Sequence, residues 1–205
     1  MTLEEQIAEA IRRFDALNAS DPRQVSLDGA SRPYELLHAE RVESWLFRLV
    51  PDPSPALRLA ARCQHLLRFR VPRDSYPPDR VGYLKWRKDL ARFHADEAEK
   101  VLVELSIDPA IRTQVRKIQL KQELKEDPET QAMEDALCLA FLEFELEEFA
   151  KSREDDKVIN IIQKTWRKMS PLGHSLALGL PLTERSARLV TEALKPDEGA
   201  TEERA

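Results

Sequence analysis

Apolar residues recur every three or four positions along most of this chain, which is the spacing of one face of an α-helix. The first such stretch contains Leu3, Ile7, Ile11 and Phe14, and it predicts a helix that ends near Asn18. Runs of β-branched residues with strict apolar and polar alternation, which would indicate strands, are missing from the sequence. The pattern therefore predicts an all-α fold.

Prolines and capping residues divide the rest of the chain into further helices. Their approximate predicted ranges are 33–50, 55–69, 82–105, 109–126, 128–152, 155–169 and 182–194, with a short segment ending at Leu180 and a loop over 19–32. Residues 195–205 are charged and hold no large apolar side chain, which predicts a disordered tail. We expect a single-domain helical bundle of about eight helices over residues 1–194.

Composition excludes several classes of protein. Only five of the 205 residues are glycine, and they are scattered singly, so no glycine-rich nucleotide-binding turn or P-loop can be written. A net charge of -5 gives no overall positive field that would attract nucleic acid. The N-terminus is acidic and no apolar run approaches the length of a membrane span, so we expect a cytoplasmic protein without a membrane partner. Cys63 and Cys138 lie in apolar helical stretches without a neighbouring cysteine, which predicts buried reduced thiols.

Four polar residues lie on or beside the apolar faces of four predicted helices. His38 and His94 lie within apolar rows, His65 lies near the edge of one, and Asp135 is the charged member of a fourth row. Three imidazoles and a carboxylate that converge on one point would bind a divalent metal ion. Each histidine taken singly is more often a hydrogen-bonded core residue, and Asp135 could instead form a buried ion pair.

Basic residues near this proposed centre predict that an anionic, phosphorylated small molecule binds there, because one guanidinium group can donate two hydrogen bonds to the oxygens of a phosphate. The candidate substrate-binding residues are Arg41, Arg68, Arg73, Arg87, Arg167, Lys168 and His174. Solvated surface charge is the alternative interpretation of each. Glu97 and Glu134, which lie close in sequence to His94 and Asp135, are the candidates for accepting a proton from an attacking water.

Six sequence strings resemble the family described as domain of unknown function 4202. They are RPYELLHAER at 32–41, AARCQH at 60–65, VPR at 71–73, YPPDR at 76–80, GYLKWR at 82–87 and KTWRKMS at 164–170. The resemblance covers about residues 14–194. It implies a family but no established chemistry.

A more distant resemblance concerns the order of the histidines and the aspartate. His38, His65, His94 and Asp135 resemble the metal ligands of the HD-domain superfamily of phosphohydrolases. That resemblance implies an all-α bundle that binds Zn, Fe, Mn, Ni or Mg and hydrolyses phosphate esters of nucleotides and related molecules. The superfamily's His-Asp doublet would place an aspartate after His65, where this chain has Leu66.

Two other classes of function stay open. The basic and aromatic string at 164–168 is typical of an RNA-binding or nucleotide-binding module, although the acidic total charge disfavours nucleic acid. A catalytically inactive helical scaffold, in which Leu66 marks the loss of a metal, is the other alternative. The sequence gives no prediction of the oligomeric state.

Overall fold

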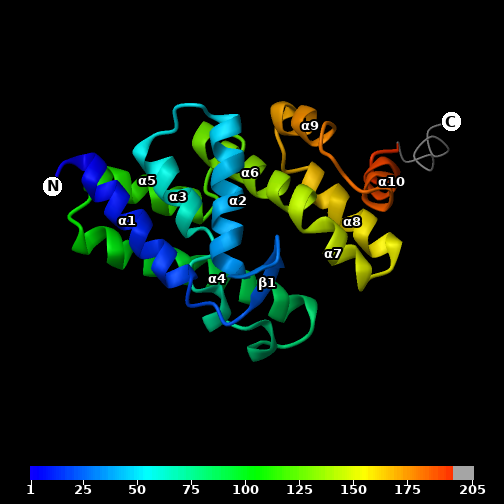
Figure 1. Cartoon of the computed structure of the whole chain (residues 1–205), viewed down its shortest axis with the longest axis horizontal. Helices are drawn as coiled ribbons and strands as arrows, with labels where there is room; N and C mark the ends of the chain where they lie inside the picture. The colour runs from blue at the N-terminus through cyan, green and yellow to red at the C-terminus, as the bar shows by residue number, and fades with distance from the viewer. Residues whose placement is uncertain (196–205) are drawn as a thin grey trace. The chain divides into compact units, whose positions relative to one another are not determined.

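The computed structural model describes residues 1–195 (Figure 1). The chain forms two compact units, which divide between Leu137 and Cys138. The all-α class is confirmed, because a single two-stranded hairpin is the only sheet within the described residues. The single domain expected over residues 1–194 stays a prediction, and the predicted tail beyond Lys195 lies outside the described residues.

The first unit contains five complete α-helices, a hairpin and the beginning of a sixth helix. Its elements are α1 (Leu3–Asn18), β1 (Gln24–Leu27), β2 (Ala30–Pro33), α2 (Tyr34–Leu49), α3 (Pro55–Cys63), the short 3-10 helices η1 (Arg68–Arg70) and η2 (Arg73–Ser75), α4 (Arg80–Glu104), α5 (Pro109–Gln119) and the first part of α6 (Pro128–Phe144). Hydroxyl and carboxylate side chains cap several of these helices, as at Ser54 for α3 and Asp108 for α5.

Helix α3 lies at the centre of the first unit and contacts α1, α2, α4 and α5 (Figure 1). Its apolar side chains are almost wholly buried. Arg62 at its end is also buried, and its guanidinium pairs with Asp15 of α1 at 2.5 Å and Glu43 of α2 at 3.0 Å. Next to it, Cys63 Sγ accepts a hydrogen bond from Gln119 Nε2 at 2.9 Å. Apolar burial and side-chain pairing together fix the helices that surround α3.

The second unit contains the end of α6 and four shorter helices. These are α7 (Leu146–Lys151), α8 (Asp155–Trp166), α9 (Pro171–Ala177) and α10 (Glu184–Ala193). Helix α8 packs on α10 through Val158 and Ile162, which are fully buried, and Asp155 pairs with Arg185 and Arg188 at 3.0 and 2.6 Å. Cys138 is buried and not disulfide-bonded, like Cys63, as the sequence predicts.

Several predicted boundaries were wrong. Residues 24–33 form a hairpin rather than a loop, and its two turn residues, Asp28 and Gly29, have φ of 51° and 81°. Helix α3 ends at Cys63 instead of continuing to residue 69, because the chain turns through a left-handed conformation at Leu67, with φ of 55°. Helix α5 ends before Lys121 for the same reason, with φ of 53°.

The helix predicted over 128–152 is two helices, α6 and α7, separated at Glu145, whose φ is -122°. Among residues 1–195, none of the helices combines the length and apolar character that crossing a membrane requires.

Candidate functional site

Three histidines predicted from the apolar rows lie together in the first unit. The rings of His38 and His65 are stacked, with centroids 4.4 Å apart and planes 6° apart. The ring of His94 is 5.9 Å from that of His65 and tilted by 36°. The structure therefore brings together three of the four predicted metal ligands.

Each histidine reaches the cluster from a different element. His38 lies on the buried face of α2 and His94 on the buried face of α4. His65 follows the end of α3, just before the left-handed turn at Leu67. Its side chain is 29 % exposed, so the cluster reaches solvent at His65.

The two nitrogens of His94 have different environments. Nδ1 donates to the carbonyl oxygen of Leu66 at 2.7 Å, and a carbonyl can only accept, so Nδ1 carries the proton. Nε2 is buried and has no hydrogen-bond partner. Desolvation lowers the pKa of His94 to about 4, so the ring is neutral at pH 7. In this tautomer Nε2 has a free lone pair, while Nδ1–H is held by a backbone carbonyl. Histidines that bind a metal through one nitrogen usually donate the other N–H to a carbonyl or carboxylate in this way.

The cluster includes a buried carboxylate that the sequence analysis missed. Glu35 precedes His38 by one helical turn on α2 and is only 3 % exposed. Its Oε2 is 3.6 Å from His65 Nδ1, and its Oε1 is 3.9 Å from Arg68 Nε. Its Oε1 also lies 3.7 Å from the guanidinium of Arg23. These are ion-pair distances rather than hydrogen bonds.

Burial sets the protonation of these groups. Desolvation raises the pKa of Glu35 to about 7, although the charges of His38 and Arg68 act in the opposite direction. Desolvation, followed by the charges of His38 and Arg68, holds the pKa of His65 well below its usual range. The site therefore combines two neutral imidazoles, those of His65 and His94, with an acid that exchanges its proton near neutral pH.

The predicted carboxylates of α6 are buried in the first unit. Asp135 Oδ1 accepts a hydrogen bond from Gln131 Nε2 at 3.1 Å, and Glu134 forms an ion pair with Lys121. The charge of Lys121 also contributes to the lowered pKa of His65, which places Lys121 near the cluster. Asp135 as a metal ligand and Glu134 as a proton acceptor stay predictions. Glu97, the other predicted acceptor, pairs with Lys100 at 2.5 Å along α4.

Among the predicted anion-binding residues of the first unit, Arg68 lies at the cluster, where it contacts Glu35 and lies 5.1 Å over the ring of Trp86. Arg73 has a different environment, since its guanidinium donates to the carbonyl oxygens of Tyr76 and Pro77 at 3.0 and 2.7 Å. Arg41 is half-buried on α2 and Arg87 is exposed on α4. Arg68 is thus the predicted cation that these contacts place beside the histidines.

The remaining predicted residues belong to the second unit. His174 stacks on Trp166 with ring centroids 4.1 Å apart and planes 4° apart, and its Nε2 donates to the Trp166 carbonyl oxygen at 2.8 Å. Arg167 is exposed and Lys168 is half-buried at the end of α8. One face of the Trp166 ring is therefore covered by an imidazole.

Metal-ligand geometry is incomplete in this arrangement. Within residues 1–195, no three His, Cys, Asp or Glu side chains are placed as ligands of one metal ion. The unprotonated Nε2 of His94 is nevertheless a suitable donor atom, because metal ligation needs neutral imidazoles. Glu35 would release its proton on binding a metal ion. Nε2 of His94 and Oε2 of Glu35 are buried in the same cluster, and neither atom has a hydrogen-bond partner.

The fold and this cluster define an all-α protein with a buried histidine and carboxylate site. More particularly, the chain belongs to the family described as domain of unknown function (DUF4202), whose model matches residues 8–190. The resemblance based on the six sequence strings is thereby confirmed. No curated protein and no solved structure matches this chain.

Proposed function

We propose that this protein binds a divalent metal ion through His38, His65 and His94 and hydrolyses a phosphate ester of an anionic small molecule. The buried Nε2 of His94 carries the proposal, because it is an acceptor with no partner on a ring whose tautomer is fixed by Leu66. A buried polar atom without a hydrogen bond costs free energy, so such an atom at a cluster of histidines points to a ligand. The distant resemblance to the HD-domain phosphohydrolases supports the same activity.

Metal binding requires the His65 ring to turn away from its stack on His38. The His65 side chain is 29 % exposed and therefore borders solvent, so this rotation would not be opposed on every side. The carboxylate ligand is Asp135, as the sequence predicts, or Glu35, which already lies beside His65. A bound divalent ion would supply a water of lowered pKa and polarise a phosphoryl oxygen.

The protein's own groups have separable roles in this proposal. Glu35, with a pKa near neutrality, is suited to accept or return a proton. Arg68, about one-third exposed beside the cluster, is suited to pair with the phosphate group of a substrate. Its guanidinium would neutralise charge on the equatorial oxygens during transfer. The substrate is accordingly a phosphorylated small molecule or nucleotide.

The two other functions have weaker support. An RNA-binding module would use Trp166 as a stacking platform, but the His174 ring already covers one face of that residue. An inactive scaffold would leave the buried acceptors of His94 and Glu35 without a ligand.

Metal titration of the purified protein tests the proposal. We expect isothermal titration with Mn²⁺, Co²⁺ or Zn²⁺ to give about one ion per chain. His94→Gln, which removes a direct ligand, should weaken binding by more than the roughly 10-fold to 100-fold that the loss of a residue supporting a ligand costs. The matched control is His174→Gln, which changes the same residue type in the second unit and should bind metal as the unchanged protein does.

Activity is measured in the same samples with p-nitrophenyl phosphate and a panel of nucleotides. Hydrolysis should require added metal and should be lost in His94→Gln. Circular dichroism verifies that both variants are folded. A folded protein that takes up none of the three metals would contradict the proposal and favour the scaffold.

A further inference from the structure

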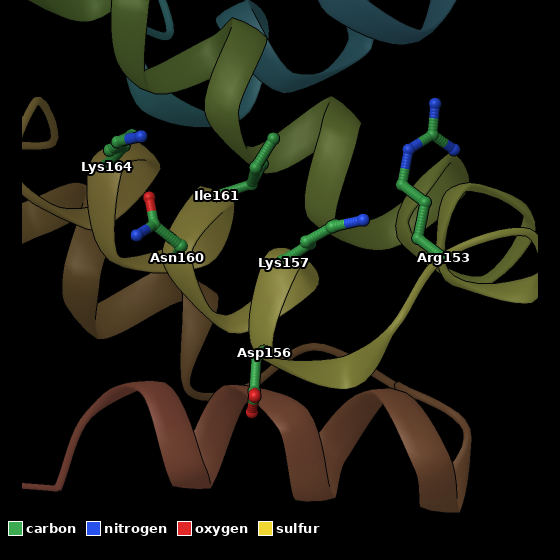
Figure 2. A pocket seen from close by; sticks show the side chains of 6 residues that line it. All are labelled: Arg153, Asp156, Lys157, Asn160, Ile161 and Lys164. Carbon is green, nitrogen blue, oxygen red and sulfur yellow. The ribbon is translucent and has the colours of Figure 1, made fainter.

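Helix α8 forms one wall of an open groove in the second unit (Figure 2). The groove has a volume of about 640 Å³, and the residues that line it are Arg153, Asp156, Lys157, Asn160, Ile161 and Lys164. In Figure 2, Asp156 points toward α10, whereas Ile161 points away from it. The side of α8 opposite α10 is therefore basic and apolar rather than acidic.

The cations of this groove have no carboxylate partner. Lys157 and Lys164 are exposed, and neither forms an ion pair with another residue of the described chain. Arg153 donates to the carbonyl oxygen of Phe149 and to Ser152 Oγ, and its guanidinium lies 3.8 Å over the Phe149 ring. Asp156 is the one carboxylate among the lining residues, and it points toward α10. The three neighbouring cations outnumber it and form a local positive surface in a chain with 37 acidic and 32 basic residues.

An exposed apolar side chain lies between the two lysines. Ile161 is 37 % exposed and is spaced four residues from Lys157 and three from Lys164, so the three side chains share one face of α8. The two lysines are about 10 Å apart along the helix axis, at a rise of about 1.5 Å per residue. This surface is long and narrow, with an apolar centre and a positive charge at each end.

We propose that this face of α8 docks an acidic peptide segment of a partner protein. Carboxylates of the segment would pair with Lys157 and Lys164, and an aliphatic side chain between them would contact Ile161. A peptide fits better than a nucleic acid, because no aromatic side chain lines the groove to stack on a base. The proposal does not depend on the metal site, whose residues all belong to the first unit.

Fluorescence anisotropy of a labelled peptide tests the docking surface in the full chain. The probe is a fluorescein-labelled ten-residue peptide of glutamate and leucine, and the comparison probes are the same peptide with lysine in place of glutamate and a labelled oligouridylate. We expect the acidic peptide alone to bind, with an affinity that falls as salt increases. Lys157→Glu with Lys164→Glu should weaken binding by about tenfold, the effect of losing two exposed ion pairs.

The matched control is Lys88→Glu with Lys125→Glu, which makes the same change of charge at two exposed positions of the first unit. It should change the affinity by less than about twofold. Ile161→Ser should weaken binding by about threefold through the lost apolar contact. Equal loss in the control, or tighter binding of the lysine peptide or of oligouridylate, would overturn the proposal.

Discussion

Glu35 is a carboxyl group whose surroundings oppose its ionisation. It is buried, and the nearest nitrogens of His65, Arg23 and Arg68 lie at 3.6 to 3.9 Å, beyond hydrogen-bond distance. A carboxylate that lacks strong hydrogen bonds is poorly compensated for its lost hydration. The unloaded site therefore stores an unfavourable interaction that a ligand can relieve.

The unfavourable burial of the ionised Glu35 side chain should make the stability of the metal-free protein depend on pH. The pKa of Glu35 is raised from 4.5 to about 7 on folding, so its favourable contribution is complete below about pH 4.5 and is lost as pH rises through 7. Glu35→Gln should therefore gain stability relative to the unchanged protein between these pH values, by about 3 kcal/mol at pH 8. Urea unfolding of both proteins at pH 4.5, 6, 7 and 8 measures the difference.

The lowered pKa values of His65 and His94 act in the opposite direction, since they remove stability as pH falls. Both histidines are present in both proteins, so comparison at each pH separates the effect of Glu35. A difference that stays constant from pH 4.5 to 8 would contradict the buried carboxyl.

The candidate site was only partly predictable at the level of single residues. His38 and His94 were recognisable because they interrupt apolar rows at helical spacing. Glu35 was missed because a glutamate in the first turn of a helix is typical of a position that stabilises the helix N-terminus. Its spacing of three residues from His38 was nevertheless a signal that both share one side of α2. Arg23 was missed because it lies beyond the hairpin, and only the fold brings it to Glu35.

At the scale of elements, the start of α4 depends on a glycine. Gly82 N–H donates to the capping Asp79 at 2.6 Å. A Cβ at this position would lie 2.2 Å from the carbonyl oxygen of Pro77, so the backbone of the proline loop would have to move. The loop and the first turn of α4 therefore pack directly on each other.

Gly82→Ala should destabilise the protein by about 3 kcal/mol, because the added Cβ would collide with backbone atoms of Pro77, which cannot move aside as a flexible side chain could. Gly179→Ala is the matched control, since the nearest atom to its added Cβ is 3.6 Å away, and it should change stability by less than about 0.5 kcal/mol. Urea unfolding provides both values. Equal effects in the two variants would show that the close approach at Pro77 is not maintained.

Helices were more predictable than the places where they end. Periodic apolar residues and caps such as Ser54 and Asp108 identified most helices near their observed positions. The ends of α3 and α5 were missed because the left-handed residues Leu67 and Lys121 are not glycines, and tertiary packing rather than local preference holds them. The hairpin was missed although Asp28 and Gly29 form a typical two-residue turn, because its strands are only four residues long.

At the scale of the whole molecule, the two proposed ligands contact different units. The proposed metal ligands come from α2, α4 and the segment after α3, whereas the proposed peptide groove lies on α8. Hydrogen exchange measured by mass spectrometry should therefore show the largest slowing in α2 and α4 when Mn²⁺ is added. The acidic peptide should give its largest slowing in α8. Metal-dependent slowing that is greatest in α8 would contradict this assignment.

The burial of Cys63 at the end of α3 has a consequence for chemical reactivity. Burial raises the pKa of the Cys63 thiol to about 12, so almost no thiolate forms at neutral pH. Cys138 is likewise enclosed. Alkylating reagents should therefore modify either sulfur only when the surrounding structure opens transiently. The alkylation rates of the two cysteines would then report how often the interior of each unit is exposed to solvent.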